Sequence, residues 1–462
     1  DIAWKRKLVY RDQKDENYTL KYNYLPENNP WINLSTQFSY SKTTQNDTRP
    51  EKAPPVFLGT LGNQSWITYS DLTFDINNTS TFNIKSTRHE LLFGLQWLKN
   101  TRNTLMYHKG KMKDKTYNYG YFQPYYMPSG RQYTQAFYLQ DQIKWKNIIF
   151  STGVRYDHIN NIGQKNLASQ YNDISVGHNY SQKNYNGWSY YLGLNYDVNH
   201  YLSLFTNFSR TWRAPVIDEQ YETQYKQASV SATSLNLEKE MINQTRVGGI
   251  ITLNHLFQEN DAFQFRTTYF YNRGKNEIFK TRGVNCVGNA ADTNKNNVCP
   301  KIIGNYRNLP GYVIQGAELE AYYQSTYLFG ELTYSYVKGK RDTSPRNPWG
   351  KTSTWIAEIP PRKATATLGF NIPKYNFTAG WRAEFVRRQD RSPLSGDPEA
   401  GYWSLPASRG YSLHNLFLSW SPAKIKGMNV KITVDNLFKR AYNPYLGELA
   451  SGTGRNIKLR LS

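Results

Sequence analysis

The feature that most constrains this chain is an alternation of apolar and polar residues, with a period of two, that recurs along its length. In 188–198, one face carries apolar side chains from Trp188 to Val198, and the other is polar apart from Tyr191. Successive side chains of a β-strand point to opposite faces, so the pattern predicts strands with one apolar and one polar face. About 17 such strands are expected, at 16–25, 31–42, 64–77, 88–98, 133–145, 147–158, 184–198, 201–210, 239–253, 262–282, 303–325, 327–339, 360–373, 375–388, 408–420, 427–437 and 453–462.

The connections between these strands alternate in length. Short connections are expected at 26–30, 78–87, 146, 199–200, 254–261, 326, 374 and 421–426. Long connections are expected at 43–63, 99–132, 159–183, 211–238, 283–302, 340–359, 389–407 and 438–452. Outer-membrane barrels have short periplasmic turns and long outer loops, whereas soluble sandwiches and propellers have no reason for this sorting. The sequence therefore predicts an all-β fold, a transmembrane antiparallel β-barrel.

The expected strand number is odd, which would make the first and last strands parallel, whereas bacterial single-chain barrels have even numbers. An odd number of strands is therefore expected before residue 1, with residues 1–15 as the end of an outer loop. The size suggests the largest barrel class, with about 22 strands and a plugged lumen. Residues 1–462 are expected to be the C-terminal part of the barrel domain, with the N-terminal plug domain and first strands outside this chain.

Composition narrows the class of protein further. The mean hydropathy is −0.73 and no run approaches the roughly 18 apolar residues of a membrane helix, which excludes a helical membrane protein. The 38 Tyr and 12 Trp suit a membrane–water interface, although a Tyr-rich soluble β-protein has a similar composition. The net charge of +22 is scattered, without a basic run or nucleic-acid motif, so no nucleic acid is expected. Anionic lipopolysaccharide or the propionates of haem fit this diffuse charge.

The only two cysteines, Cys286 and Cys299, flank a polar stretch of Asn, Asp and Gly that is typical of a loop. A metal site would need further Cys or His residues nearby. The pair predicts a disulfide that closes one outer loop in an oxidising compartment.

Several segments resemble TonB-dependent outer-membrane receptors of the haem and haemoglobin type. The WRAP segment and the SLNLEKE segment at 234–240 resemble two boxes in one outer loop of these receptors. The segments at 314–323 and 434–445 resemble a late strand and the closing hairpin of the barrel. The likeness is greatest to receptors that take up haem and haemopexin-bound haem in Haemophilus-type bacteria. The residues that match the boxes are Trp212, Arg213, Ala214, Pro215, Asn236 and Leu237.

The resemblance implies a haem ligand between the two boxes, but the family's His is missing from 216–234. Tyr221 and Tyr225 lie in or near this interval, and tyrosinate can bind ferric haem. His108 and His178, in other outer loops, are further candidates, and Lys109 beside His108 can meet a propionate. Each candidate also has an ordinary interpretation as a loop residue, and the box residues have one as loop architecture.

The resemblance implies a receptor, not an enzyme, that captures haem and imports it into the periplasm. Its ligand is free haem, or haem from haemopexin, haemoglobin or a secreted carrier, and the inner-membrane TonB complex supplies energy through a segment outside this chain, the TonB box. No permanently bound cofactor is expected and no metal beyond haem iron. Three alternatives stay open: a siderophore or other metal-chelate receptor, a passive porin, and a barrel enzyme.

Overall fold

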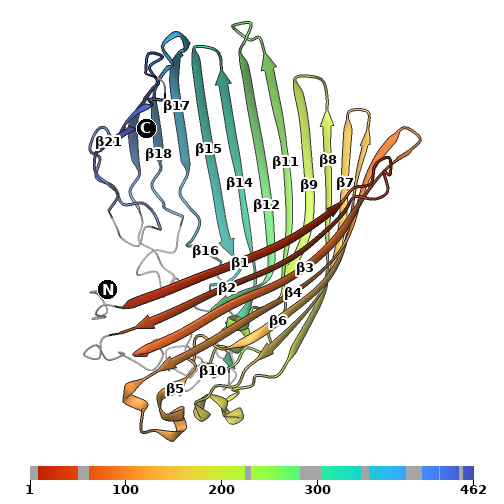
Figure 1. The fold of residues 1–462 in the computed structure, drawn as a ribbon, viewed down its shortest axis with the longest axis vertical. Coiled ribbons are helices and arrows are strands. Elements are labelled where there is room, and N and C mark those ends of the chain that lie inside the picture. Colours follow the sequence, from red (N-terminus) through yellow and green to blue (C-terminus); the bar gives the residue numbers. More distant parts are fainter. Residues whose placement is uncertain are drawn as a thin grey trace.

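The computed structural model describes residues 9–49, 62–223, 230–280, 303–304, 306–344, 353–391, 408–425, 427–446 and 451–462. Nearly all of the regular structure is β-sheet (Figure 1). The strands are β1 (Tyr10–Tyr24), β2 (Leu34–Thr48), β3 (Gln64–Ile84), β4 (Thr87–Tyr107), β5 (Tyr121–Phe122), β6 (Gly130–Trp145), β7 (Ile148–Gly163), β8 (Lys183–Asp197), β9 (Leu202–Arg213), β10 (Val230–Ala232), β11 (Glu240–Asn254), β12 (Ala262–Lys280), β13 (Ile303–Gly304), β14 (Tyr306–Gln324), β15 (Leu328–Arg341), β16 (Thr354–Trp355), β17 (Lys363–Ile372), β18 (Phe377–Val386), β19 (Tyr411–Trp420), β20 (Val430–Asp435) and β21 (Asn456–Leu461).

The helical elements are short and lie mainly between the strands. The α-helix α1 comprises Ile217–Tyr221. The 3-10 helices are η1 (Lys109–Lys111), η2 (Lys115–Gly120), η3 (Ser169–Asn172), η4 (Ile174–Val176) and η5 (Pro373–Tyr375). None of the helices in the described part of the chain has the length and apolar character needed to cross a membrane.

Nineteen strands form one sheet in which each long strand pairs with its neighbour in the chain, always antiparallel. Within the described residues, the edges of this sheet are β1 and β21 (Figure 1). Short turns join the strands at one end, for example residues 146–147 between β6 and β7, and long segments join them at the other. The sheet order and the alternation of connection lengths confirm the predicted up-and-down barrel wall.

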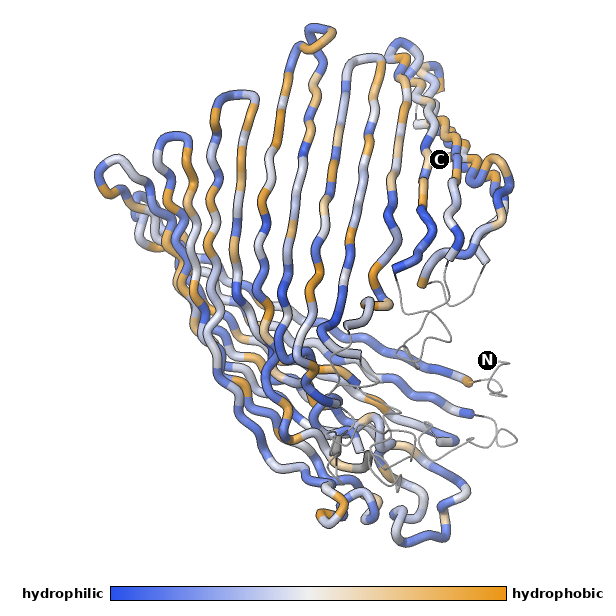
Figure 2. The backbone as a smooth tube through the Cα atoms, turned by 180° about the vertical axis from the view of Figure 1, so that it is seen from behind, coloured by the Kyte–Doolittle hydropathy of each residue, from blue (hydrophilic) through white to orange (hydrophobic). Residues whose placement is uncertain are grey.

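The registers of these pairings place the apolar positions on one continuous face. Leu139 of β6 pairs with Phe93 of β4 and Val154 of β7, and Val154 pairs with Tyr190 of β8. The same alignment continues at the other edge of the sheet through Leu328, Phe370, Ala379, Leu418, Ile432 and Leu459. Apolar and polar residues accordingly alternate along the strands (Figure 2). We call this side the apolar face.

The opposite face is polar. Its side chains reach across an intervening strand to meet one another, which indicates that this face is concave. The Tyr138 hydroxyl of β6 donates to Asp75 of β3 at 3.2 Å, across β4. Arg155 of β7 donates to Gln96 of β4 at 2.8 Å, across β6. Farther along this polar face, a cavity of about 620 Å³ is lined partly by Glu318 and Glu320.

The structure corrects several predicted boundaries, and β2 and β7 each continue by five or more residues into connections that were expected to be long loops. The expected short connection at 78–87 is a turn of two residues, 85–86, because the polar run from Asn77 to Thr81 pairs with β4. Strand β4 continues to Tyr107, through the start of the long loop expected at 99–132. Residues 10–15, expected in an outer loop, belong to β1 and pair with β2.

Candidate ligand-binding site

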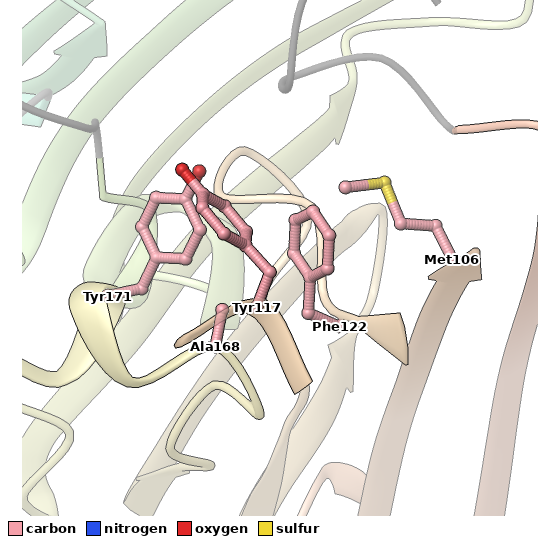
Figure 3. Close-up of a cluster of buried hydrophobic side chains, with 5 residues drawn as sticks. All are labelled: Met106, Tyr117, Phe122, Ala168 and Tyr171. Carbon is pink, nitrogen blue, oxygen red and sulfur yellow. The ribbon is translucent and has the colours of Figure 1, made fainter. Parts of the chain in front are cut away.

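Buried side chains gather where the long connections fold over the polar face. Met106, Tyr117, Phe122, Ala168 and Tyr171 form a cluster that we call the aromatic cluster (Figure 3). The cluster joins the end of β4, η2, β5, and η3 with the residue before it. The ring centroids of Tyr117 and Phe122 lie 5.1 Å apart, and Tyr171 lies 6.3 Å from each of them. These contacts are typical of the hydrophobic core of a soluble protein.

His108 lies next to this cluster, two residues beyond Met106 and directly before η1. Its backbone N–H donates to the Gly120 carbonyl at 2.8 Å, which fixes the start of the loop. The imidazole is half-buried, and burial together with the charge of Lys111 lowers the pKa of His108. Among the described residues, nothing hydrogen-bonds its buried Nδ1. A neutral imidazole with a free ring nitrogen is the form that binds iron.

Two lysines follow His108, and they differ in their surroundings. Lys109 is exposed, and its backbone N–H donates to Asn63 Oδ1 at 2.8 Å. Lys111 places its ammonium group 4.1 Å from the Tyr117 ring centroid and 3.4 Å from Asp114. The charge of Lys109 thus stands at the surface beside His108, whereas Lys111 is held against the aromatic cluster.

His178 lies on the same cluster through Tyr171, whose ring centroid is 6.4 Å from that of His178. The His178 side chain is buried, and its backbone N–H donates to the Asp173 carbonyl at 3.1 Å across η4. His178 thus contacts the aromatic cluster through its ring, and His108 adjoins the cluster through its backbone, although the two residues are 70 positions apart in the sequence.

Tyr221, at the end of α1, is completely buried. Its hydroxyl lies 3.0 Å from the Asn161 carbonyl and 2.9 Å from the Ser181 carbonyl, and its ring stacks on Tyr180 at 6.2 Å. Burial raises the pKa of Tyr221, and it raises the pKa of Tyr180 to about 12, so both phenols stay protonated at neutral pH. In this arrangement Tyr221 fixes α1 to β7. Its neighbour Tyr225 lies outside the described residues, as do Cys286 and Cys299.

The first box holds α1 in place through charge. Arg213 lies between Glu219 at 2.7 Å and Glu240 at 2.9 Å, and Glu219 also accepts the Val216 N–H at 3.0 Å. Ala214 is buried. Trp212 points to the other side of the strand, where the Lys239 ammonium lies 5.0 Å from its ring. These contacts favour the architectural interpretation of the first box.

The Pro215 carbonyl and the second box, with Asn236 and Leu237, complete the contacts that hold α1 in place. Asn161 of β7 donates to the Pro215 carbonyl and to Gln220 Oε1, both at 2.7 Å. Leu237 is buried and its carbonyl accepts from the Tyr185 hydroxyl at 3.0 Å, whereas Asn236 is exposed. The two boxes thus position α1 over the polar face, and Asn236 is the box residue that faces solvent.

Sequence reasoning missed the charged contacts that surround α1. Arg102 of β4 is buried, forms an ion pair with Asp218 of α1 and lies 5.1 Å from the Tyr69 ring. Lys280 of β12 pairs with the buried Glu222 at 2.7 Å. Their partners are far away in sequence, so only the packing of α1 against the strands brings them together. Within the described residues, no group of three or more His, Cys, Asp or Glu side chains is arranged to hold a metal ion.

The wall and the loops that fold over it define a class of protein. Residues 1–437 match the family model described as TonB dependent receptor-like, beta-barrel, and the chain belongs to this family. Two Haemophilus influenzae proteins named TonB-dependent heme receptor A are 94% and 91% identical to the whole chain, which spans 62% of their length. A Haemophilus influenzae heme/hemopexin utilization protein C is 25% identical over 68% of this chain and 41% of that protein.

Solved structures of low sequence identity share the fold. The FrpB iron transporter of Neisseria meningitidis (F3-3 variant) matches with a TM-score of 0.68 at 15% identity, over 98% of this chain and 63% of that chain. The Serratia marcescens hemophore receptor HasR, in complex with its hemophore HasA and heme, matches with a TM-score of 0.66 at 16% identity. That alignment covers 97% of this chain and 65% of the HasR chain. These likenesses confirm the predicted barrel-type fold.

Proposed function

We propose that this chain is the barrel part of an outer-membrane receptor that binds haem at the cell surface and imports it with energy from the TonB system. The observation that carries the proposal is the 94% identity with a protein named TonB-dependent heme receptor A. The apolar face supports the location, because a barrel wall in a membrane turns its apolar side chains to lipid and its polar ones to the lumen. Free haem, haemopexin, haemoglobin or a secreted carrier protein is the source.

The aromatic cluster and its two histidines form the proposed haem site. The rings of the cluster are buried and hold the two loops in place, and a neutral imidazole suits haem iron. His108 is the first candidate ligand, because its imidazole is only half-buried and its Nδ1 has no hydrogen-bond partner among the described residues. His178 is buried against Tyr171, so it binds only if this loop opens. Lys109 is the candidate partner for a propionate.

A haem titration of the protein purified at full length from outer membranes tests both proposals. We expect a Soret band that saturates with one haem, and a shift of that band with weaker binding in His108→Ala or His178→Ala. His200→Ala is the matched control, because His200 is exposed in the short turn between β8 and β9. An unchanged spectrum in both loop variants would reject the two ligands. Failure of the wild-type protein to bind haem, with binding of a ferric siderophore, would favour the metal-chelate alternative.

A further inference from the structure

A group of positive side chains lies at the long-loop end of β15, β17 and β18. Tyr334, Ala364 and Phe385 pair across these three strands on the apolar face. Two residues closer to the long loops, the corresponding positions are occupied by Tyr336, Arg362 and Arg387. The Arg387 N–H donates to the Arg362 carbonyl at 3.0 Å. Arg362 and Arg387 directly flank β17 and β18, and continued alternation of the side chains places both on the apolar face, where Arg362 contacts the Tyr336 ring.

Three further cations complete this group. Lys338 and Lys340 follow Tyr336 at the alternate positions of β15, so they share its face. Arg391 reaches the same place from the segment after β18, where its Nη1 donates to the Val337 carbonyl at 2.9 Å. We call Lys338, Lys340, Arg362, Arg387 and Arg391 the cationic patch.

Aromatic rings hold part of the cationic patch in position. The guanidinium groups of Arg362 and Arg391 lie 4.6 and 4.8 Å from the centroid of the Tyr336 ring. The Lys340 ammonium lies 4.5 Å from the Trp355 ring. Such contacts order a cation without neutralising it, so its charge stays available to a ligand.

Carboxylates compensate little of this charge in the described part of the chain. Asp390 approaches Arg391 only to 4.0 Å and is itself 68% exposed. Glu358 is nearby but lies 3.8 Å from Arg341, which is not a member of the patch. None of the ion pairs between described residues includes Lys338, Lys340, Arg362 or Arg387.

We propose that the cationic patch binds the phosphorylated head group of a glycolipid in the outer leaflet, the lipid anchor of lipopolysaccharide. The inference rests on the proposed outer-membrane location. The patch stands directly above apolar side chains of the same strands, Leu332, Tyr334 and Phe385, which suit acyl chains. A lipid with two head-group phosphates matches a group of several arginines and lysines, because guanidinium groups bind phosphate by paired hydrogen bonds.

Native mass spectrometry of the full-length protein in detergent tests this assignment with bisphosphorylated lipid A as the probe. The triple variant Lys338→Gln, Arg362→Gln and Arg387→Gln should bind the probe at least about tenfold more weakly, since each cation near an anionic lipid contributes to attraction. The matched control replaces Lys85, Lys374 and Lys424 with Gln, because these exposed lysines lie in short turns at the other end of the strands. The control should bind as the wild type does.

Lipid A without phosphate and phosphatidylglycerol are the comparison probes. Binding that survives removal of the phosphates, or that is equally weak in the triple variant and the control, would overturn the proposal. Haem titration of the same preparations separates this inference from the proposed function. Lipid binding without haem binding would contradict haem uptake and support the lipid site, whereas the opposite result would contradict only the lipid site.

Discussion

The wall of the sheet and its long-loop end follow different physical rules. Along the wall, large apolar residues such as Leu139, Trp188 and Leu368 remain 39%, 53% and 61% exposed within the protein. At the long-loop end, Tyr221, Phe122 and Tyr171 are completely buried. The wall therefore requires an apolar environment outside the protein, whereas the loop end carries its own core.

This difference also separates the roles of the two regions. The wall is specified by a simple alternation that many sequences satisfy. The loop end depends on particular pairs, such as Tyr221 with the Asn161 carbonyl and Arg213 with Glu240. Specific ligand chemistry belongs where the contacts are specific, so we expect recognition at the loop end.

The largest expected effect destabilises the long-loop end and leaves the strands of the wall intact. Tyr221→Ala removes a fully buried aromatic ring and should destabilise the packing of α1 by about 3–5 kcal/mol. Hydrogen exchange in 214–240 should rise, while β7 and β8 stay protected. Tyr221→Phe keeps the ring and should cost only about 1 kcal/mol. Equal loss of protection in α1 and in the barrel strands would contradict the separation of the two regions.

The next effect destabilises the strands of the wall and leaves the long-loop end intact. Leu139→Arg puts a charge on the apolar face and should cost about 2–4 kcal/mol if that face contacts the bilayer near its midplane. Gln140→Arg, one residue later, places the same charge on the polar face and should have little effect. Urea unfolding of the protein folded into vesicles measures both. Equal destabilisation by the two variants would show that the apolar face is not turned to lipid.

A smaller effect is expected when an ion pair is removed at the long-loop end, compared with removal of an exposed ion pair on the wall. Arg213→Ala leaves Glu219 and the nearly buried Glu240 without their shared cation, and should loosen α1 by about 1–2 kcal/mol. The wall pair of Lys14 and Glu16 is exposed, so Lys14→Ala should leave stability unchanged. Limited proteolysis within 214–240 reports on both variants. Wild-type resistance in Arg213→Ala would show that this ion-pair group is dispensable.

The smallest effect is a shift in pH dependence. Because burial lowers the pKa of His108 below its ordinary value of 6.5, its imidazole should remain neutral as the pH falls through 6.5. Protonation at a still lower pH should remove the iron-binding lone pair, so haem affinity should fall there. Titration of haem affinity downward from pH 8 should show this step only below pH 6.5 in the wild type, and His108→Ala should lack it. A step at or above pH 6.5 would contradict the buried environment.

The sequence predicted the wall because alternation is local. Each expected strand is present, and the polar run from Asn78 to Thr81 was misjudged since Asn, Ser and Thr also favour turns. The loop end was much less predictable. Tyr221 and Asn161 are 60 positions apart, and no local pattern reveals that the two meet. The WRAP segment indicated where these contacts gather, but the partners of Arg213, Glu240 and Glu219, became clear only from the strand register and the position of α1.

The candidate site was predicted in its members but not in its arrangement. His108 and His178 were identified as loop histidines, yet their connection through Tyr171 and the aromatic cluster depends on how two long loops pack together. The assignment of iron ligands stays a prediction, as does the disulfide between Cys286 and Cys299.

The most direct test of the account is growth on haem as the sole iron source, in cells for which this receptor is the single route of haem uptake. Wild-type cells should grow, and cells in which both His108 and His178 are replaced by Ala should grow poorly on limiting haem while growing normally on inorganic iron. Failure of the wild-type cells to grow on haem, with normal growth on inorganic iron, would contradict haem import by this protein.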